Sequence, residues 1–162
     1  MLIANMGFMD YRQALNKSAA LCSRKEYCSS DIRKKLVNWD LSDDEVDKAI
    51  DWLKQEKFID DGRYAGYYVK DKFVFNGWGR IKIRYQLRAK GIESSLIEIA
   101  MEQIDEGDYL GKMAELLHSK VRRIKNKDKW QTKAALARFA QSRGFEPDIV
   151  FRAIDNLLND IT

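Results

Sequence analysis

The chain has 162 residues, a formal net charge of +4 and a pI near 9.0. Cys22 and Cys28 are too few for a disulfide framework and lack the spacing of a zinc site, which argues against a disulfide-stapled secreted domain. No apolar run reaches the length of a membrane span, and the first residues lack a signal-peptide pattern. We therefore expect a cytoplasmic protein that does not bind membranes.

Helical spacing of apolar residues recurs along the chain, and a single proline leaves long helices uninterrupted. Three predicted helices, the opening helices, show this spacing. One covers residues 11–25, one begins at Asp60 or Asp61, and one covers residues 108–123. Breaks follow at residues 76–79, 105–107 and 126–128, where Gly, Asn and Asp gather. Sustained alternation of period two is missing, so we predict no strands.

An internal repeat links three later segments, residues 31–50, 82–101 and 137–154. The segments align when they are anchored on Leu41, Ile92 and Phe145. The residue before each anchor is suited to the left-handed backbone that ends a helix: Asp40, Gly91 and Gly144. The residue five places after each anchor is apolar and predicts a hydrophobic staple: Val46, Ile97 and Val150.

Each copy of the repeat therefore contains a helix, a tight turn and a second helix. Ser42 and Glu45 have the spacing of a capping box, and Pro147 fits the first position of its helix. Adding the three opening helices gives an all-α fold of three tandem three-helix repeats, at residues 10–58, 59–105 and 106–160. Stacking of such units predicts an elongated, slightly curved body.

Charge is distributed unevenly along the chain. Residues 40–61 contain nine carboxylates and three lysines, whereas residues 80–90 contain five cations and no carboxylate. Residues 120–143 are again basic, with Asp128 as the only carboxylate. Two separate blocks of one sign are typical of a surface that binds a polyanion. The alternative is that these cations only solvate helix faces.

Motifs that carry catalytic chemistry are missing from the sequence. His118 is the only histidine, and no cysteine lies near it in sequence. Neither a P-loop nor a dinucleotide-binding glycine pattern occurs. The acidic run 40–51 lacks the residue order of a calcium loop. We therefore predict no enzyme activity, no catalytic residue, no metal site and no cofactor.

Two tryptophans are candidates for base stacking, because Trp78 and Trp130 lie in or near basic segments. Packing between helical units is the alternative role for both. Trp52 stands beside Leu53 on a predicted core face. Arg80 and Lys82 follow a glycine-containing turn at a helix N-terminus, where a phosphate could bind.

A three-helix unit with a tight turn also occurs in helix-turn-helix DNA readers. In this chain the helices after the turns begin with carboxylates, at residues 43–45, 93 and 146–148. Carboxylates at these positions would repel DNA phosphates, so we do not expect sequence-specific readout.

Several segments together resemble the RecX family, the regulators of RecA recombinase. Residues 58–69, Phe58-Ile59-Asp60-Asp61-Gly62-Arg63-Tyr64-Ala65-Gly66-Tyr67-Tyr68-Val69, resemble the signature that opens the second repeat of that family. Residues 77–82, 86–92 and 143–145 fit the family pattern as well, and residues 14–29 look like its first helix and turn. The resemblance covers about residues 11–158. Gly62 and the turn at residues 38–40 depart from the common pattern.

The resemblance implies three tandem three-helix repeats, a fold that the internal alignment predicts independently. It also implies binding in the helical groove of the RecA–DNA filament, inhibition of RecA, and affinity for nucleic acid. We expect a monomer that binds single- and double-stranded DNA without sequence preference. The alternative is a basic helical DNA-binding or architectural protein that acts without RecA.

The predicted nucleic-acid or filament-binding face consists of the cations of the two basic blocks, with Trp78 and Trp130 beside them. These cations are Arg80, Lys82, Arg84, Arg88, Lys90, Arg122, Arg123, Lys125, Lys133 and Arg138.

Overall fold

The computed structural model describes residues 9–161, and its secondary structure within that range is helical. The helices in chain order are α1 (Tyr11–Arg24), α2 (Ser29–Asn38), α3 (Asp43–Gln55), α4 (Asp61–Val74), α5 (Arg80–Ala89), α6 (Ser94–Met101), α7 (Glu106–Val121), α8 (Lys129–Ser142) and α9 (Pro147–Ile161). The all-α prediction is confirmed. No helix in this range is long and apolar enough to cross a membrane.

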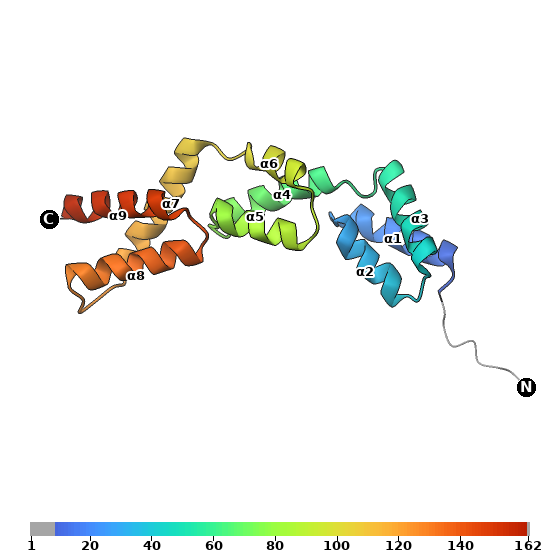
Figure 1. The fold of residues 1–162 in the computed structure, drawn as a ribbon, viewed down its shortest axis with the longest axis horizontal. Helices are drawn as coiled ribbons and strands as arrows, with labels where there is room; N and C mark the ends of the chain where they lie inside the picture. Colours follow the sequence, from blue (N-terminus) through green and yellow to red (C-terminus); the bar gives the residue numbers. More distant parts are fainter. Residues whose placement is uncertain (1–8, 162) are drawn as a thin grey trace, which may run out of the picture. The chain divides into compact units, whose positions relative to one another are not determined.

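The helices pack as two compact units. The first runs to Tyr64 and includes the turn Lys90–Ile92, and the second contains Ala65–Ala89 and the chain from Glu93 onwards. Figure 1 shows α1, α2 and α3 packed together in the first unit, and α7, α8 and α9 packed together in the second. The division into repeats at 10–58, 59–105 and 106–160 stays a prediction.

The three predicted turns are confirmed by their backbone conformation. Asp40, Gly91 and Gly144 have φ values of 63°, 74° and 91°, all in the left-handed region. In the first turn the amide of Leu41 donates to the carbonyl of Leu36 at 3.3 Å, which is the bond of a Schellman motif. The equivalent bond in the third turn has a length of 3.2 Å. The anchor residues Leu41 and Phe145 therefore each close the preceding helix through this hydrogen bond.

Capping residues fix the helix starts. The Ser42 hydroxyl accepts a hydrogen bond from the amide of Glu45, and the Glu45 carboxylate accepts one from the amide of Ser42, so the predicted capping box is confirmed. Pro147 is the first residue of α9, as predicted. Helix α7 begins at Glu106, two residues before the predicted start, because Asp105 accepts a hydrogen bond from the amide of Asp108 at 3.0 Å and caps it there.

The core of the first unit lies between α1, α2 and α3. Its buried residues include Ala14, Ile32, Leu36, Val46, Ala49, Ile50, Leu53 and Ile59. The prediction that Trp52 belongs to this core is wrong, because 37% of Trp52 is exposed. Successive helix residues are rotated by about 100°, so Leu53 faces the core while Trp52 lies at its edge. The Trp52 ring stacks on Phe58 with centroids 5.8 Å apart.

The segment that resembles a RecX signature serves a structural role in the first unit. Asp61 accepts two hydrogen bonds from Ser29, one from its amide at 2.8 Å and one from its hydroxyl at 2.6 Å. Arg63 donates to Glu26 at 2.7 Å. These contacts hold the start of α4 against Glu26 and the first residue of α2, so Asp61 and Arg63 of the signature stabilise the fold.

Candidate nucleic-acid interface

Arg80, the first residue of α5, is held inside the second unit. Its guanidinium donates to Glu106, lies 3.7 Å from the nearer carboxylate oxygen of Glu146 and stacks 3.9 Å above the centroid of the Tyr109 ring. Only 19% of its side chain is exposed. The charge of Arg80 is therefore balanced by carboxylates of the protein itself, which reduces what it can offer to an external phosphate.

Tyr109 of α7 is fully buried beside Arg80. Its hydroxyl donates to Glu146 at 2.6 Å and accepts a hydrogen bond from the amide of Arg80 at 3.1 Å. Burial, followed by the adjacent Glu146 carboxylate, raises the pKa of Tyr109 well above its ordinary value. The ring also packs against Phe73 and Phe145, with centroids 5.9 Å and 5.2 Å away. Tyr109 thus joins α4, α5, α7 and the turn before α9.

The glycine-containing turn before α5 is part of the same joint. The amide of Gly79 donates to the carbonyl of Arg143 at 2.7 Å, and the amide of Ile81 donates to the carbonyl of Gly144 at 3.0 Å. Arg143 in turn donates to the carbonyl of Asn76 at 2.7 Å. Main-chain donors that could have held a phosphate are therefore used to join two turns of the second unit.

Replacing Tyr109 by phenylalanine should lower the free energy of unfolding by about 1–2 kcal/mol near pH 8, since the Arg80 amide and Glu146 lose a buried partner. The folded state favours the neutral hydroxyl, so this stabilisation is complete below the unfolded-state pKa of about 10 and is lost as pH rises through the higher folded-state pKa. Urea unfolding of both proteins at about pH 8 and pH 11 measures this. A stability difference that does not shrink at the higher pH would contradict it.

Trp78 lies beside cations of its own unit. The ammonium groups of Lys72 and Lys82 are 5.3 Å and 4.5 Å from the centroid of its ring. The Lys82 ammonium also lies 3.5 Å from the carbonyl of Ser142. Because these lysines already occupy positions over the ring, a base would have to displace them before it could stack on Trp78.

Three more of the predicted cations have carboxylate partners. Arg84 of α5 forms two hydrogen bonds to Glu98 of α6, at 2.9 Å and 3.0 Å, and these bonds lower the pKa of Glu98. In the first unit, Lys90 lies 3.2 Å from Asp31. Lys133 of α8 lies 2.6 Å from Asp155 of α9. These partners are 14, 59 and 22 residues away in sequence, so the composition of the basic blocks does not reveal them.

The remaining predicted cations are exposed and have no carboxylate within ion-pairing distance in residues 9–161. They are Arg88, Arg122, Arg123, Lys125 and Arg138. Four of the five belong to the end of α7, the connection to α8, or α8 itself. The free positive charge of the predicted face is therefore concentrated in that part of the second unit.

A hollow of about 420 Å³ lies on α8 in this basic region. Asn126, Lys127, Trp130, Gln131, Ala134 and Arg138 line it. Trp130 is 76% exposed, so the structure brings one predicted stacking residue and one predicted cation together. Sequence reasoning missed Lys127 and Ala134 as members of this site, although the spacing of residues 130, 134 and 138 already places them on one helix face.

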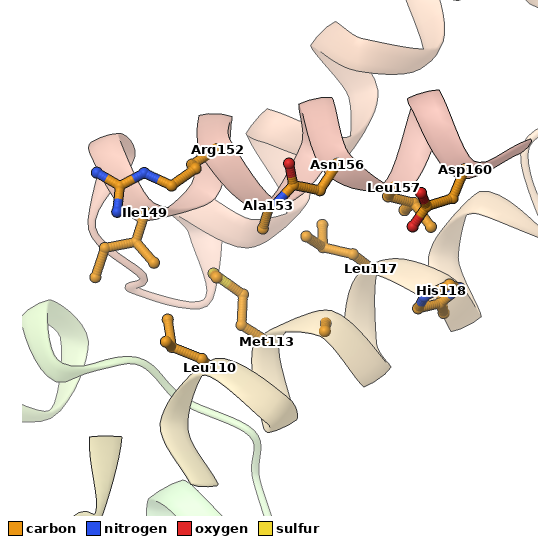
Figure 2. Close-up of a pocket in the computed structure, with 11 residues that line it drawn as sticks. Leu110, Met113, Leu117, His118, Ile149, Arg152, Ala153, Asn156, Leu157 and Asp160 are labelled. Atoms are coloured by element: carbon orange, nitrogen blue, oxygen red, sulfur yellow. The ribbon is translucent and has the colours of Figure 1, made fainter. Parts of the chain in front are cut away.

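A second hollow, of about 310 Å³, lies between α7 and α9. Figure 2 shows Met113 and Leu117 of α7 pointing towards α9, with Arg152 and Asp160 at the rim. None of the predicted cations lines this hollow. Nor do residues 9–161 contain a group of three or more His, Cys, Asp or Glu side chains that could hold a metal ion.

Comparison with known proteins identifies the fold and the family. Residues 60–101 match the RecX second three-helix domain, and residues 108–154 match the RecX third three-helix domain. A curated "Regulatory protein RecX" of Clostridium botulinum (strain Eklund 17B / Type B) is 32% identical over 130 residues, which cover 79% of this chain and 60% of that protein. The chain belongs to the RecX family.

Further RecX proteins agree with this assignment. A "Regulatory protein RecX" of Clostridium beijerinckii is 29% identical over 145 residues, covering 88% of this chain and 67% of that protein. A crystal structure of regulatory protein RecX aligns with a TM-score of 0.83 and 26% identity over 90% of this chain and 73% of that one. RecX from Lactobacillus salivarius aligns with the same TM-score at 21% identity, over 94% of this chain and 97% of that one.

These matches confirm the predicted architecture of tandem three-helix repeats. The chain spans about 60% of the length of the two Clostridium botulinum RecX proteins that it matches. The two RecX domain matches contain Arg80, Tyr109 and Gly144, whereas Glu106 lies between them. They also contain the α8 hollow.

Proposed function

We propose that this chain is a regulator of RecA recombinase and acts as an inhibitor that binds in the groove of the RecA–DNA filament. It would thereby modulate recombination and DNA repair. Membership of the RecX family carries this proposal. The relatives that it matches carry the name "Regulatory protein RecX".

The distribution of free charge supports a filament that contains DNA as the target. Arg122, Arg123, Lys125 and Arg138 are exposed and have no carboxylate partner in residues 9–161. Cations of this kind bind phosphates of any sequence, and each contact releases counterions from the DNA. Helices α3 and α9 carry carboxylates in their first turns, and Glu93 is the N-cap of α6, which supports binding without sequence preference.

The proposed face is narrower than the one predicted from sequence. Its cations are Arg88, Arg122, Arg123, Lys125 and Arg138. Lys82 contributes less to binding, because its ammonium group lies over the Trp78 ring. Arg80, Arg84, Lys90 and Lys133 would act mainly by stabilising the fold, since each is paired with a carboxylate. We propose that the chain binds as a monomer.

Addition of this protein at stoichiometric amounts should lower the ATPase rate of RecA on single-stranded DNA severalfold, because an occupied groove restricts the filament. The assay compares RecA alone, RecA with this protein, and RecA with an unrelated basic protein of similar charge. The third sample controls for competition by charge alone. An unchanged rate, with binding to bare DNA retained, would favour a DNA-binding or architectural protein that acts without RecA.

A further inference from the structure

Trp130 differs from the other candidate stacking residue in its surroundings. It is 76% exposed, and within residues 9–161 no cation or second ring lies over it. Trp78, in contrast, has Lys72 and Lys82 over its ring. An exposed indole gains nothing from burial in the folded protein, so its surface remains available to a ligand.

The residues around Trp130 form a shaped site on one face of α8. Trp130, Ala134 and Arg138 are four residues apart and therefore lie in a row along the helix. The row borders the core face of α8, where Leu136, Ala137 and Ala140 are buried. The Cα atoms of Trp130 and Arg138 are about 12 Å apart along the helix. Because the side chain of Ala134 is small, it leaves a gap between the Trp130 indole and the Arg138 guanidinium.

The electrostatics of this site favour an anion. Lys127 and Arg138 line the hollow, and neither has a carboxylate partner in the described part of the chain. The nearest carboxylate in sequence, Asp128, is occupied as the N-cap of α8 and accepts a hydrogen bond from the amide of Gln131 at 2.7 Å. A ligand that enters the hollow thus meets two cations and an aromatic ring.

A nucleotide of a single strand matches this combination of groups. Its phosphate is an anion, and every base offers a flat face that stacks on an indole. A protein carboxylate would use the cations and leave Trp130 without a partner. A duplex would hide the faces of its bases in the stack, so only its phosphates could bind.

We propose that the hollow lined by Lys127, Trp130, Ala134 and Arg138 binds one nucleotide of single-stranded nucleic acid. The base stacks on Trp130, and the adjoining phosphate is bound by Lys127 and Arg138. This site deepens the proposed function, on which it rests in part, because it distinguishes residues that bind the nucleic acid of the filament from residues that bind its protein.

The first test replaces Trp130 by alanine and measures binding to fluorescent oligothymidylate of about 20 nucleotides by anisotropy, without RecA. Loss of one stacking contact should weaken binding about tenfold. Binding to a duplex of the same length should change less than twofold. Phe75→Ala is the matched control, because Phe75 is an exposed aromatic residue of the same unit at 81% exposure and does not line this hollow.

The second test separates the phosphate contact from the shape of the hollow. Arg138→Gln should reduce the salt dependence of oligothymidylate binding by about 0.7 in log–log slope, whereas Trp130→Ala should leave the slope unchanged. Ala134→Leu changes no charge, and leucine is also a strong helix former. Its larger side chain fills the gap between Trp130 and Arg138, so it should weaken single-strand binding about as much as Trp130→Ala. Arg12→Gln, in α1, controls for the loss of one charge.

Equal affinity of Trp130→Ala and wild type for oligothymidylate would overturn the proposal, as would equal losses on single strand and duplex. Because these experiments use bare DNA, their outcome does not depend on RecA. A protein that has no effect on RecA but binds single strands through Trp130 would refute the proposed function and leave this site standing. If the protein inhibits RecA but its affinity for bare DNA is unchanged by Trp130→Ala, the proposed function would stand and this site would be refuted.

Discussion

Replacing Gly144 by alanine should destabilise the second unit by about 3 kcal/mol or more. Gly144 has a φ of +91°, which an L side chain rarely adopts, and a Cβ atom there would lie 2.3 Å from the Cβ of Lys82 and 2.5 Å from its amide nitrogen. The turn would have to move away from α5, and the hydrogen bond from the amide of Ile81 to the carbonyl of Gly144 would be lost.

Gly79→Ala should have a similar effect from the opposite side of the joint. Its Cβ would lie 2.4 Å from the backbone of Gly144 and Phe145, which cannot yield as a flexible side chain can. Displacement of this turn would also break the 2.7 Å bond from the amide of Gly79 to the carbonyl of Arg143. Both substitutions therefore act on one contact and should not be additive when combined.

Two further glycines provide the matched controls for urea unfolding followed by circular dichroism. Gly111 lies inside α7 with open space around it, so Gly111→Ala should stabilise the protein by about 0.5–1 kcal/mol. Gly91 also has open space but a φ of +74°, so Gly91→Ala should cost about 1 kcal/mol through backbone strain alone. If Gly144→Ala costs no more than Gly91→Ala, the close packing of the two turns is wrong.

Reversing three free cations should abolish most of the binding to RecA filaments on single-stranded DNA. We expect the variant Arg122→Glu, Arg123→Glu, Arg138→Glu to bind about 100-fold more weakly at moderate salt, and the salt dependence to fall by about 2 in log–log slope. The three side chains are exposed and have no carboxylate partner in residues 9–161, so their reversal should leave the helical content unchanged.

The control for this variant carries the same change in net charge on the first unit. Arg12, Lys34 and Lys54 are exposed residues of α1, α2 and α3. Their replacement by glutamate should change filament affinity less than fivefold, because the contribution of distant charges is largely screened. Equal losses for both variants would mean that net charge, and not a local face, determines binding.

The fold could be predicted from sequence because its determinants are local. The left-handed residues Asp40, Gly91 and Gly144 and the buried anchors after them occur at fixed spacing, and a helix end requires such spacing by its own geometry. The start of α7 was harder to place, since both Asp105 and Asp108 are residue types that can cap a helix.

Which cations of the predicted face remain free could not be predicted from sequence, because the pairing of charges depends on tertiary structure. Arg84 and Arg88 lie on the same short helix, yet within residues 9–161 only Arg84 forms hydrogen bonds to a carboxylate, that of Glu98 in α6. Trp78 and Trp130 both stand in basic segments, yet lysines cover only the first. Composition predicts the sign of the charge on a surface, whereas the packing of neighbouring helices decides which cations and aromatic rings remain free.

The most direct test of RecA regulation through these cations is the RecA ATPase rate on single-stranded DNA with three proteins at equal concentration. These are wild type, the Arg122, Arg123 and Arg138 variant, and the Arg12, Lys34 and Lys54 control. Wild type and control should lower the rate severalfold, and the first variant should leave it close to that of RecA alone. An unchanged rate with wild-type protein, or equal inhibition by all three, would contradict the account.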